Sequence, residues 1–199
     1  MKSLYKTILV LVFVAAVVIG AVNSGQNKND IYYYFQERHA VTFISALLLG
    51  MTSLLAFILS FLHNQKRPNK NPLNFWVFSC IGFFYLSLDE YFMMHEGLDV
   101  PLVEMVGRDP QTFSMDSLFF VILAIAGFLV AVYFWRDISR DKSFIGLCVL
   151  GTLCLGGMVV FDMLNQNTAV IKVIEESFKI TGVTFFFAAF LSELFRQLT

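Results

Sequence analysis

The chain has 199 residues, of which 57% are hydrophobic and only 15% charged, and its formal net charge is -1. A soluble domain has roughly 25% charged residues, so this composition excludes an ordinary water-soluble protein. A net charge near zero also gives no support for a nucleic-acid partner. We expect a single all-α domain over residues 1–199 whose partner is membrane lipid; the sequence identifies no protein partner.

Six apolar runs approach or exceed the roughly 20 residues that a helix needs to cross a bilayer. In chain order they cover residues 7–23, 40–62, 73–94, 117–135, 143–162 and 170–194. All four prolines lie between these runs, so none interrupts a predicted helix. The sequence therefore predicts a polytopic bundle of about six transmembrane helices.

The first run has an alternative interpretation, because Lys2 and Lys6 precede it as basic residues precede the core of a signal peptide. Its apolar core extends to Val22, and no clear small-residue cleavage site follows. Both features favour an uncleaved helix. The fifth run contains four glycines, which predict close helix packing there: Gly146, Gly151, Gly156 and Gly157.

Basic residues gather on one predicted side of the membrane. That side contains the two ends of the chain and the connections with Lys66, Arg67, Lys70, Arg136, Arg140 and Lys142. The opposite connections contain only Lys28, Arg38 and Arg108. Because cytoplasmic loops are enriched in lysine and arginine, both termini are predicted to be cytoplasmic, in a bacterial inner membrane.

Acidic residues gather at the other predicted side, where two spans contribute most of them. The third span is uncharged from Leu73 to Leu88, and Asp89, Glu90, His95 and Glu96 follow. The sixth span contains Glu175 and Glu176 near its start. Ionisable groups at membrane depth are costly and therefore indicate a functional site.

Helical periodicity predicts which of these groups share a face. Asp89 and Glu96 are seven residues apart, so they lie on one face if the third helix runs through Glu96. Lys172, Glu175 and Lys179 share a face of the sixth helix, and we expect Lys179 to neutralise Glu175 one turn earlier.

A divalent metal would neutralise several of these carboxylates at once, since buried carboxylates must be paired, protonated or bound to a cation. Carboxylates with an imidazole suit iron, manganese or zinc. The predicted ligands are Asp89, His95, Glu96 and Glu176. Glu90 and Glu175 are predicted to support them or to act as a general base, in an enzyme acting on a lipid or another hydrophobic substrate.

Three alternatives remain open. The acidic residues could be the solvated end of a membrane helix, or the rim of a non-catalytic scaffold subunit. They could also form the entry site of a proton- or cation-coupled transporter or channel subunit. Against transport, the inner halves of the six predicted spans show no ionisable residues that would continue a polar pathway.

The segments LSLDEYFMMHEGLD and VIEESFKITG resemble a family of uncharacterised bacterial multi-pass membrane proteins. Its members combine an LDE-x4-HE segment with a later helix that contains two adjacent glutamates. The resemblance implies that six residues belong to one site, and it implies no activity. These are Asp89, Glu90, His95, Glu96, Glu175 and Glu176.

Overall fold

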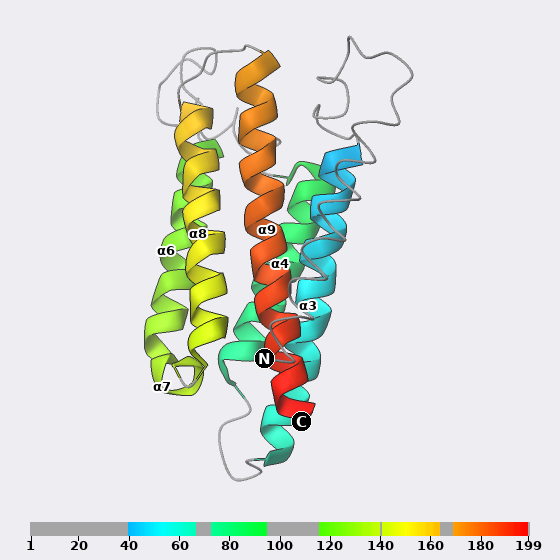
Figure 1. The fold of residues 1–199 in the computed structure, drawn as a ribbon, viewed down its shortest axis with the longest axis vertical. Coiled ribbons are helices and arrows are strands. Elements are labelled where there is room, and N and C mark those ends of the chain that lie inside the picture. The colour runs from blue at the N-terminus through cyan, green and yellow to red at the C-terminus, as the bar shows by residue number, and fades with distance from the viewer. Residues whose placement is uncertain (1–39, 67–72, 95–115, 140, 164–168, 199) are drawn as a thin grey trace.

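The structure is a computed structural model that describes residues 40–66, 73–94, 116–139, 141–163 and 169–198 (Figure 1). These ranges form helices and no strand, which confirms the all-α prediction for the described part of the chain. The helices are α3 (Ala40–Lys66), α4 (Phe75–Phe92), α6 (Asp116–Tyr133), α7 (Trp135–Ile138), α8 (Lys142–Met163) and α9 (Ala169–Leu198). The first predicted run, residues 7–23, lies outside the described residues.

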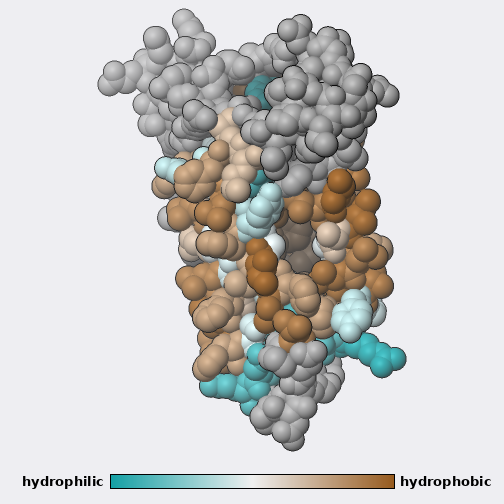
Figure 2. All heavy atoms as spheres, turned by 180° about the vertical axis from the view of Figure 1, so that it is seen from behind, coloured by the Kyte–Doolittle hydropathy of each residue, from teal (hydrophilic) through white to brown (hydrophobic). Residues whose placement is uncertain are grey.

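Three of these helices contain segments that are long and apolar enough to cross a membrane. The segments are Val41–Lys66, Lys142–Phe161 and Val170–Leu198, and α6 adds a shorter apolar stretch, Val121–Tyr133. Large hydrophobic side chains such as Phe57 and Leu153 are mostly exposed. Figure 2 shows hydrophobic side chains over the middle of one face and hydrophilic ones near the end where α7 lies. Lipid is the solvent that suits such a surface.

Helices α3, α4 and α9 enclose the core, and α8 packs along α9 (Figure 1). The described part of α6 has few contacts with the rest of the bundle. Near the α7 end of the bundle, the rings of Phe75, Trp76, Phe144 and Phe190 pack with centroids 5.1–6.4 Å apart. Edge-to-face and stacked contacts between these rings fix the ends of three helices against one another.

Small residues allow α3 and α4 to pack closely. Ser53 donates a hydrogen bond to the carbonyl oxygen of Cys80, and Ser87 donates one to that of Ala46, each over 2.8 Å. A Cβ atom on Gly50 would lie 3.2 Å from Ser87 Oγ. Interhelical hydroxyl bonds and small side chains are the usual means of helix association where no water is present.

Asn74 begins α4 and connects it to α3. Its side-chain oxygen accepts hydrogen bonds from the backbone N–H groups of Trp76 and Val77, at 3.0 and 3.2 Å. Its side-chain nitrogen donates to Asn64 Oδ1 of α3 over 2.9 Å. Because a capping side chain satisfies N–H groups that have no partner within the helix, Asn74 defines both the start of α4 and its position on α3.

Candidate functional site

Lys179 of α9 lies between two glutamates at the end of the bundle opposite α7. Its Nζ atom is 2.9 Å from Glu90 Oε1 of α4 and 2.8 Å from Glu176 Oε1 of α9. The side chains of Lys179, Glu90 and Glu176 are only 14%, 12% and 2% exposed. We call these three residues the buried ion triad. It joins the third and sixth predicted spans.

A third helix reaches the triad through Ser45 of α3. Ser45 is fully buried, and its hydroxyl donates a 2.5 Å hydrogen bond to Glu90 Oε1. That oxygen therefore accepts from both Ser45 and Lys179. The contacts fix the Glu90 carboxylate at the junction of α3, α4 and α9, because hydrogen bonds to an ionised acceptor are the strong ones.

The triad contains two carboxylates and one ammonium, so it carries a charge of -1 when all three groups are ionised. The second oxygen of Glu176, Oε2, is buried and has no hydrogen-bond partner among the described residues. A buried carboxylate oxygen without a partner is costly. One added positive charge at Glu176 Oε2 would make the triad neutral and would give this oxygen a partner.

Glu175 lies beside the triad but has a different partner. Its Oε1 atom is 3.6 Å from Lys172 Nζ, and the Lys172 side chain is 30% exposed. The prediction that Lys179 neutralises Glu175 was therefore wrong. Lys179 instead contacts Glu176 one turn earlier, on the side of α9 where Glu90 of α4 supplies a second carboxylate.

The predicted shared face of Asp89 and Glu96 depended on the third helix running through Glu96, which lies outside the described residues. Helix α4 ends at Phe92, and Met93 follows in the left-handed conformation with φ 54°. The Met93 N–H group donates to the Asp89 carbonyl oxygen over 2.7 Å, which closes the helix. Asp89 itself is buried, with a relative exposure of 2%. The described part of α4 therefore ends four residues before Glu96, and the shared face stays a prediction.

The predicted metal-ligand set is only partly within the described residues. Asp89 and Glu176 are described and buried, whereas His95 and Glu96 lie outside the described ranges. Among the described residues, no group of three or more histidine, cysteine, aspartate or glutamate side chains is placed to hold a metal ion. The ligand set, and the supporting or general-base roles of Glu90 and Glu175, stay predictions.

A second charged cluster lies at the other end of α9 and was missed in the sequence. Glu193 is 3% exposed and accepts hydrogen bonds from Arg196 and Gln197, at 2.6–2.8 Å. Arg196 also approaches Asp141, which caps the start of α8. The expectation that the inner half of the last span has no ionisable group was therefore wrong. The spacing of Glu193 and Arg196, three residues apart on one helix, was the available signal.

Apolar side chains separate the two charged clusters. Leu48 and Leu49 of α3 pack against Val183 and Phe187 of α9. Next to them, the ring of Phe83 packs against those of Phe186 and Phe190, with centroids 5.4 and 5.3 Å away. In this conformation, hydrocarbon lies between the buried ion triad and the Glu193 cluster.

The chain belongs to the family of the domain of unknown function DUF8692, whose sequence model matches residues 4–194. No curated protein and no solved structure matches the chain. Membership of an uncharacterised family is thereby confirmed. The family match brings no activity with it, so the function must be argued from the geometry of the site.

Proposed function

We propose that this DUF8692 protein is a six-span protein of the bacterial inner membrane that binds an exchangeable cation, a proton in the first place, at the buried ion triad. Residues 7–23 would form the first span, and α3, α4, α6, α8 and α9 the other five. Both termini would lie in the cytoplasm. The triad would be the coupling site of a proton- or cation-coupled transporter or channel subunit.

The ends of the described helices support this topology. Lys66 at the end of α3 donates a 3.2 Å hydrogen bond to the backbone oxygen of Gln197 near the end of α9, so these two ends lie together. Lys142 begins α8 at the same end of the bundle, beside α7 (Figure 1). Lysine and arginine concentrated at one end favour that end being cytoplasmic, so the triad would lie near the extracytoplasmic end.

The observation that carries the proposal is that Glu176 Oε2, in a triad of net charge -1, has no hydrogen-bond partner in the part of the chain that the structure describes. A proton on Glu176 Oε2 would leave Oε1 free to accept from Lys179. It would also leave the Lys179 ammonium and the Glu90 carboxylate as a neutral pair. Intramembrane carboxylates with such partners are typical of proton and ion pathways.

Proton uptake at Glu176 would change what holds α9 in place. The ionised Glu176 and Glu90 both attract Lys179, whereas a protonated Glu176 leaves Glu90 as the stronger partner. Binding and release of a cation would therefore shift the balance of contacts between α4 and α9. Since the apolar layer closes the inner side, transport would require a second conformation, and the cation would change its population.

A metal ion is the second candidate for the cation. It is favoured by Glu176 Oε2, which has no partner within the described ranges, and by the burial of Asp89 one residue before Glu90. Iron, manganese or zinc would then be held by Glu176 and Asp89 together with His95 and Glu96. Glu90 and Glu175 would support these ligands. A proton is preferred because the Lys179 ammonium already lies between the two glutamates.

Proton flux into proteoliposomes that contain a pH-sensitive dye tests the proposal. Under an imposed potential, we expect the native protein to conduct protons and Glu176→Gln to lose the flux, because an amide cannot bind and release a proton. Glu175→Gln is the matched control and should keep the flux, since Glu175 lies outside the triad. Elemental analysis of the same preparations tests the metal.

Equal flux from the native protein and Glu176→Gln would exclude the triad as a proton site. Absence of flux in both, with stoichiometric metal in the native protein and none in Glu176→Gln, would establish the metal centre instead. Absence of both flux and metal would leave the triad a structural element of a scaffold subunit.

A further inference from the structure

One side of α9 faces away from α3, α4 and α8 and is nevertheless buried. Gly182 of α9 faces α8, Phe187 packs against α3, and the ring of Phe190 contacts a ring of α4. Because a helix turns by about 100° per residue, Ala188 points roughly 120°, 100° and 160° away from these three residues. Its exposed fraction is 0%. In Figure 1, α9 lies in front of α4 with α8 on its left and α3 on its right, so the remaining side is the one toward the viewer.

Small residues form this side of α9. Thr184, Ala188 and Ser192 follow one another at four-residue intervals, and each is at most 6% exposed. We call these three residues the far face of α9. The Thr184 hydroxyl donates to the backbone oxygen of Ile180 in the same helix over 2.7 Å, so it does not need a donor or acceptor from a neighbour. Small residues at four-residue spacing let a second membrane helix approach closely.

Protein, rather than lipid, covers the far face of α9. Side chains on the open flanks of the bundle remain exposed, as Phe128 of α6 and Leu153 of α8 do at 66% each. Ala188, in contrast, has no exposed surface. Since the described helices that contact α9 lie on its other sides, the cover must come from residues outside the described ranges.

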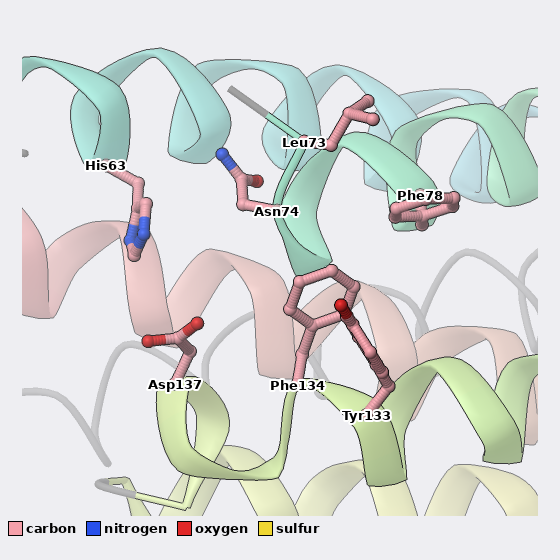
Figure 3. A pocket seen from close by; sticks show the side chains of 7 residues that line it. All are labelled: His63, Leu73, Asn74, Phe78, Tyr133, Phe134 and Asp137. Atoms are coloured by element: carbon pink, nitrogen blue, oxygen red, sulfur yellow. The ribbon is translucent and has the colours of Figure 1, made fainter. Parts of the chain in front are cut away.

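The pocket of about 410 Å³ at the α7 end of the bundle is a separate feature. Its walls come from α3, α4 and the segment that joins α6 to α7, and none of its lining residues belongs to α9 (Figure 3). Two of them, His63 and Asp137, point toward each other in Figure 3. The pocket therefore does not explain what lies against the far face.

Length and composition decide which segment reaches the far face, whose middle lies about 15 Å from the carboxyl end of α9. At that depth in a membrane the segment must be an apolar helix. Residues 67–72 and 164–168 are too short, and residues 24–39 and 95–115 contain several charged side chains. Residues 7–23 form an uncharged apolar run that would extend for roughly 25 Å as a helix.

We propose that residues 7–23 pack as a helix against the far face of α9 and antiparallel to it. The run has small residues of its own at the same four-residue spacing, Ala16 and Gly20. When Ala16 lies level with Ala188, Gly20 lies level with Thr184, so small residues meet on both helices. This inference rests on the six-span part of the proposed function, and it makes α9 the central helix of the bundle.

The start of α3 supports this placement. Val41, at the start of α3, packs against Ile180 of α9. Residues 24–39 connect the run to this point, so the run is tethered close to α9 at the end of the bundle where the buried ion triad lies. Thr181, one turn from Thr184 toward that end, is exposed, as expected where the run would end.

Disulfide formation between introduced cysteines tests the packing, in a protein whose native cysteines Cys80, Cys148 and Cys154 are replaced by alanine. We expect Ala16→Cys to link with Ala188→Cys in oxidised membranes, because the Cβ atoms of a disulfide lie about 3.5–4.5 Å apart. Ala189→Cys is the matched control. Ala189 is the next residue and is equally buried, but it belongs to the core cluster with Phe75 and Phe144 and should not link. Gly20→Cys with Thr184→Cys tests the second contact.

Mass spectrometry of the linked peptides and of the intact protein separates the outcomes. Links in both pairs, within one chain, would support the proposal. A full-length folded protein without a link in either pair, with equal linking of Ala189→Cys, or with links only between two chains would overturn the packing and leave the six spans standing. An intact mass that lacks residues 7–23 would overturn both the packing and the six-span topology.

Discussion

Replacing Lys179 with methionine is expected to lower the free energy of unfolding by about 3–5 kcal/mol, the largest effect that we predict for a single substitution. The ammonium contacts both Glu90 and Glu176 in a site where all three side chains are at most 14% exposed. Methionine has nearly the same length but no charge, so the buried Glu90 carboxylate would remain beside Glu176 without a cation. Thermal and denaturant unfolding in detergent would measure the loss.

A triple variant separates the charge effect from a packing effect. Glu90→Gln and Glu176→Gln, added to Lys179→Met, remove every charge of the triad together. We expect this protein to recover most of the stability that Lys179→Met loses, because a neutral set of similar volume leaves no buried charge uncompensated. A triple variant as unstable as Lys179→Met would show that the loss comes from packing.

Lys172→Met is the matched control on the same helix. Lys172 pairs with Glu175 at 3.6 Å, and its side chain is 30% exposed. Partly exposed pairs are worth roughly 0–1 kcal/mol, so the substitution should have a small effect. An equal loss from Lys172→Met and Lys179→Met would contradict a special role for the buried triad.

Replacing Gly182 with alanine is expected to be the second most damaging change, with a loss of about 1–3 kcal/mol. A Cβ atom there would lie 3.0 Å from the carbonyl oxygen of Gly151 on α8 and 3.0 Å from the Leu155 side chain. The Gly151 oxygen is backbone and cannot rotate away. Helices α8 and α9 would have to separate along their contact, and thermal unfolding would report the loss.

Gly156→Ala is the control for that substitution. Gly156 lies on α8 beside the same interface, but a Cβ atom there meets nothing within 4 Å among the described residues. Alanine favours helices over glycine by about 1 kcal/mol, so Gly156→Ala should leave stability unchanged or raise it. A loss from Gly156→Ala as large as that from Gly182→Ala would mean that the close approach of α8 and α9 is not what requires glycine.

The sequence predicted the helices well because apolar runs of membrane length are a strong and local signal. The fifth run, 143–162, corresponds to α8, which spans Lys142–Met163. The sixth, 170–194, was four residues too short at its end, because α9 continues to Leu198 through Glu193 and Arg196, which pair along the helix. Because the two charged side chains form an ion pair within the helix, the helix continues past the point at which hydropathy alone predicts that the span ends.

The packing of individual glycines was harder to predict. Four glycines in the fifth run predicted close contact, and two of them make it: Gly151 approaches Gly182, and Gly157 approaches Phe178. Gly146 and Gly156 face open space among the described residues. The sequence of one helix shows where its small residues are, but not which of its faces the neighbouring helix contacts. That face decides which glycine is required.

The candidate site followed from the sequence only in part. Glu90 and Glu176 were assigned to one site, and the structure joins them through Lys179. The partner of Lys179 was predicted wrongly because positions three and four residues earlier are both within reach on a helix. Glu90, which comes from another helix, decides between them. The end of α4 at Met93 could not be predicted from the sequence either, because methionine has no preference for the left-handed conformation.

Infrared spectroscopy of the carboxyl groups tests most directly whether Glu176 holds a proton. The C=O stretch of a protonated carboxyl differs in frequency from the stretches of a carboxylate. Loss of the band in a variant therefore assigns it to the replaced residue. At neutral pH we expect a protonated-carboxyl band in the native protein and in Glu175→Gln, and its absence in Glu176→Gln. Spectra without that band in the native protein, or with the same band in Glu176→Gln, would contradict a proton site at the buried ion triad.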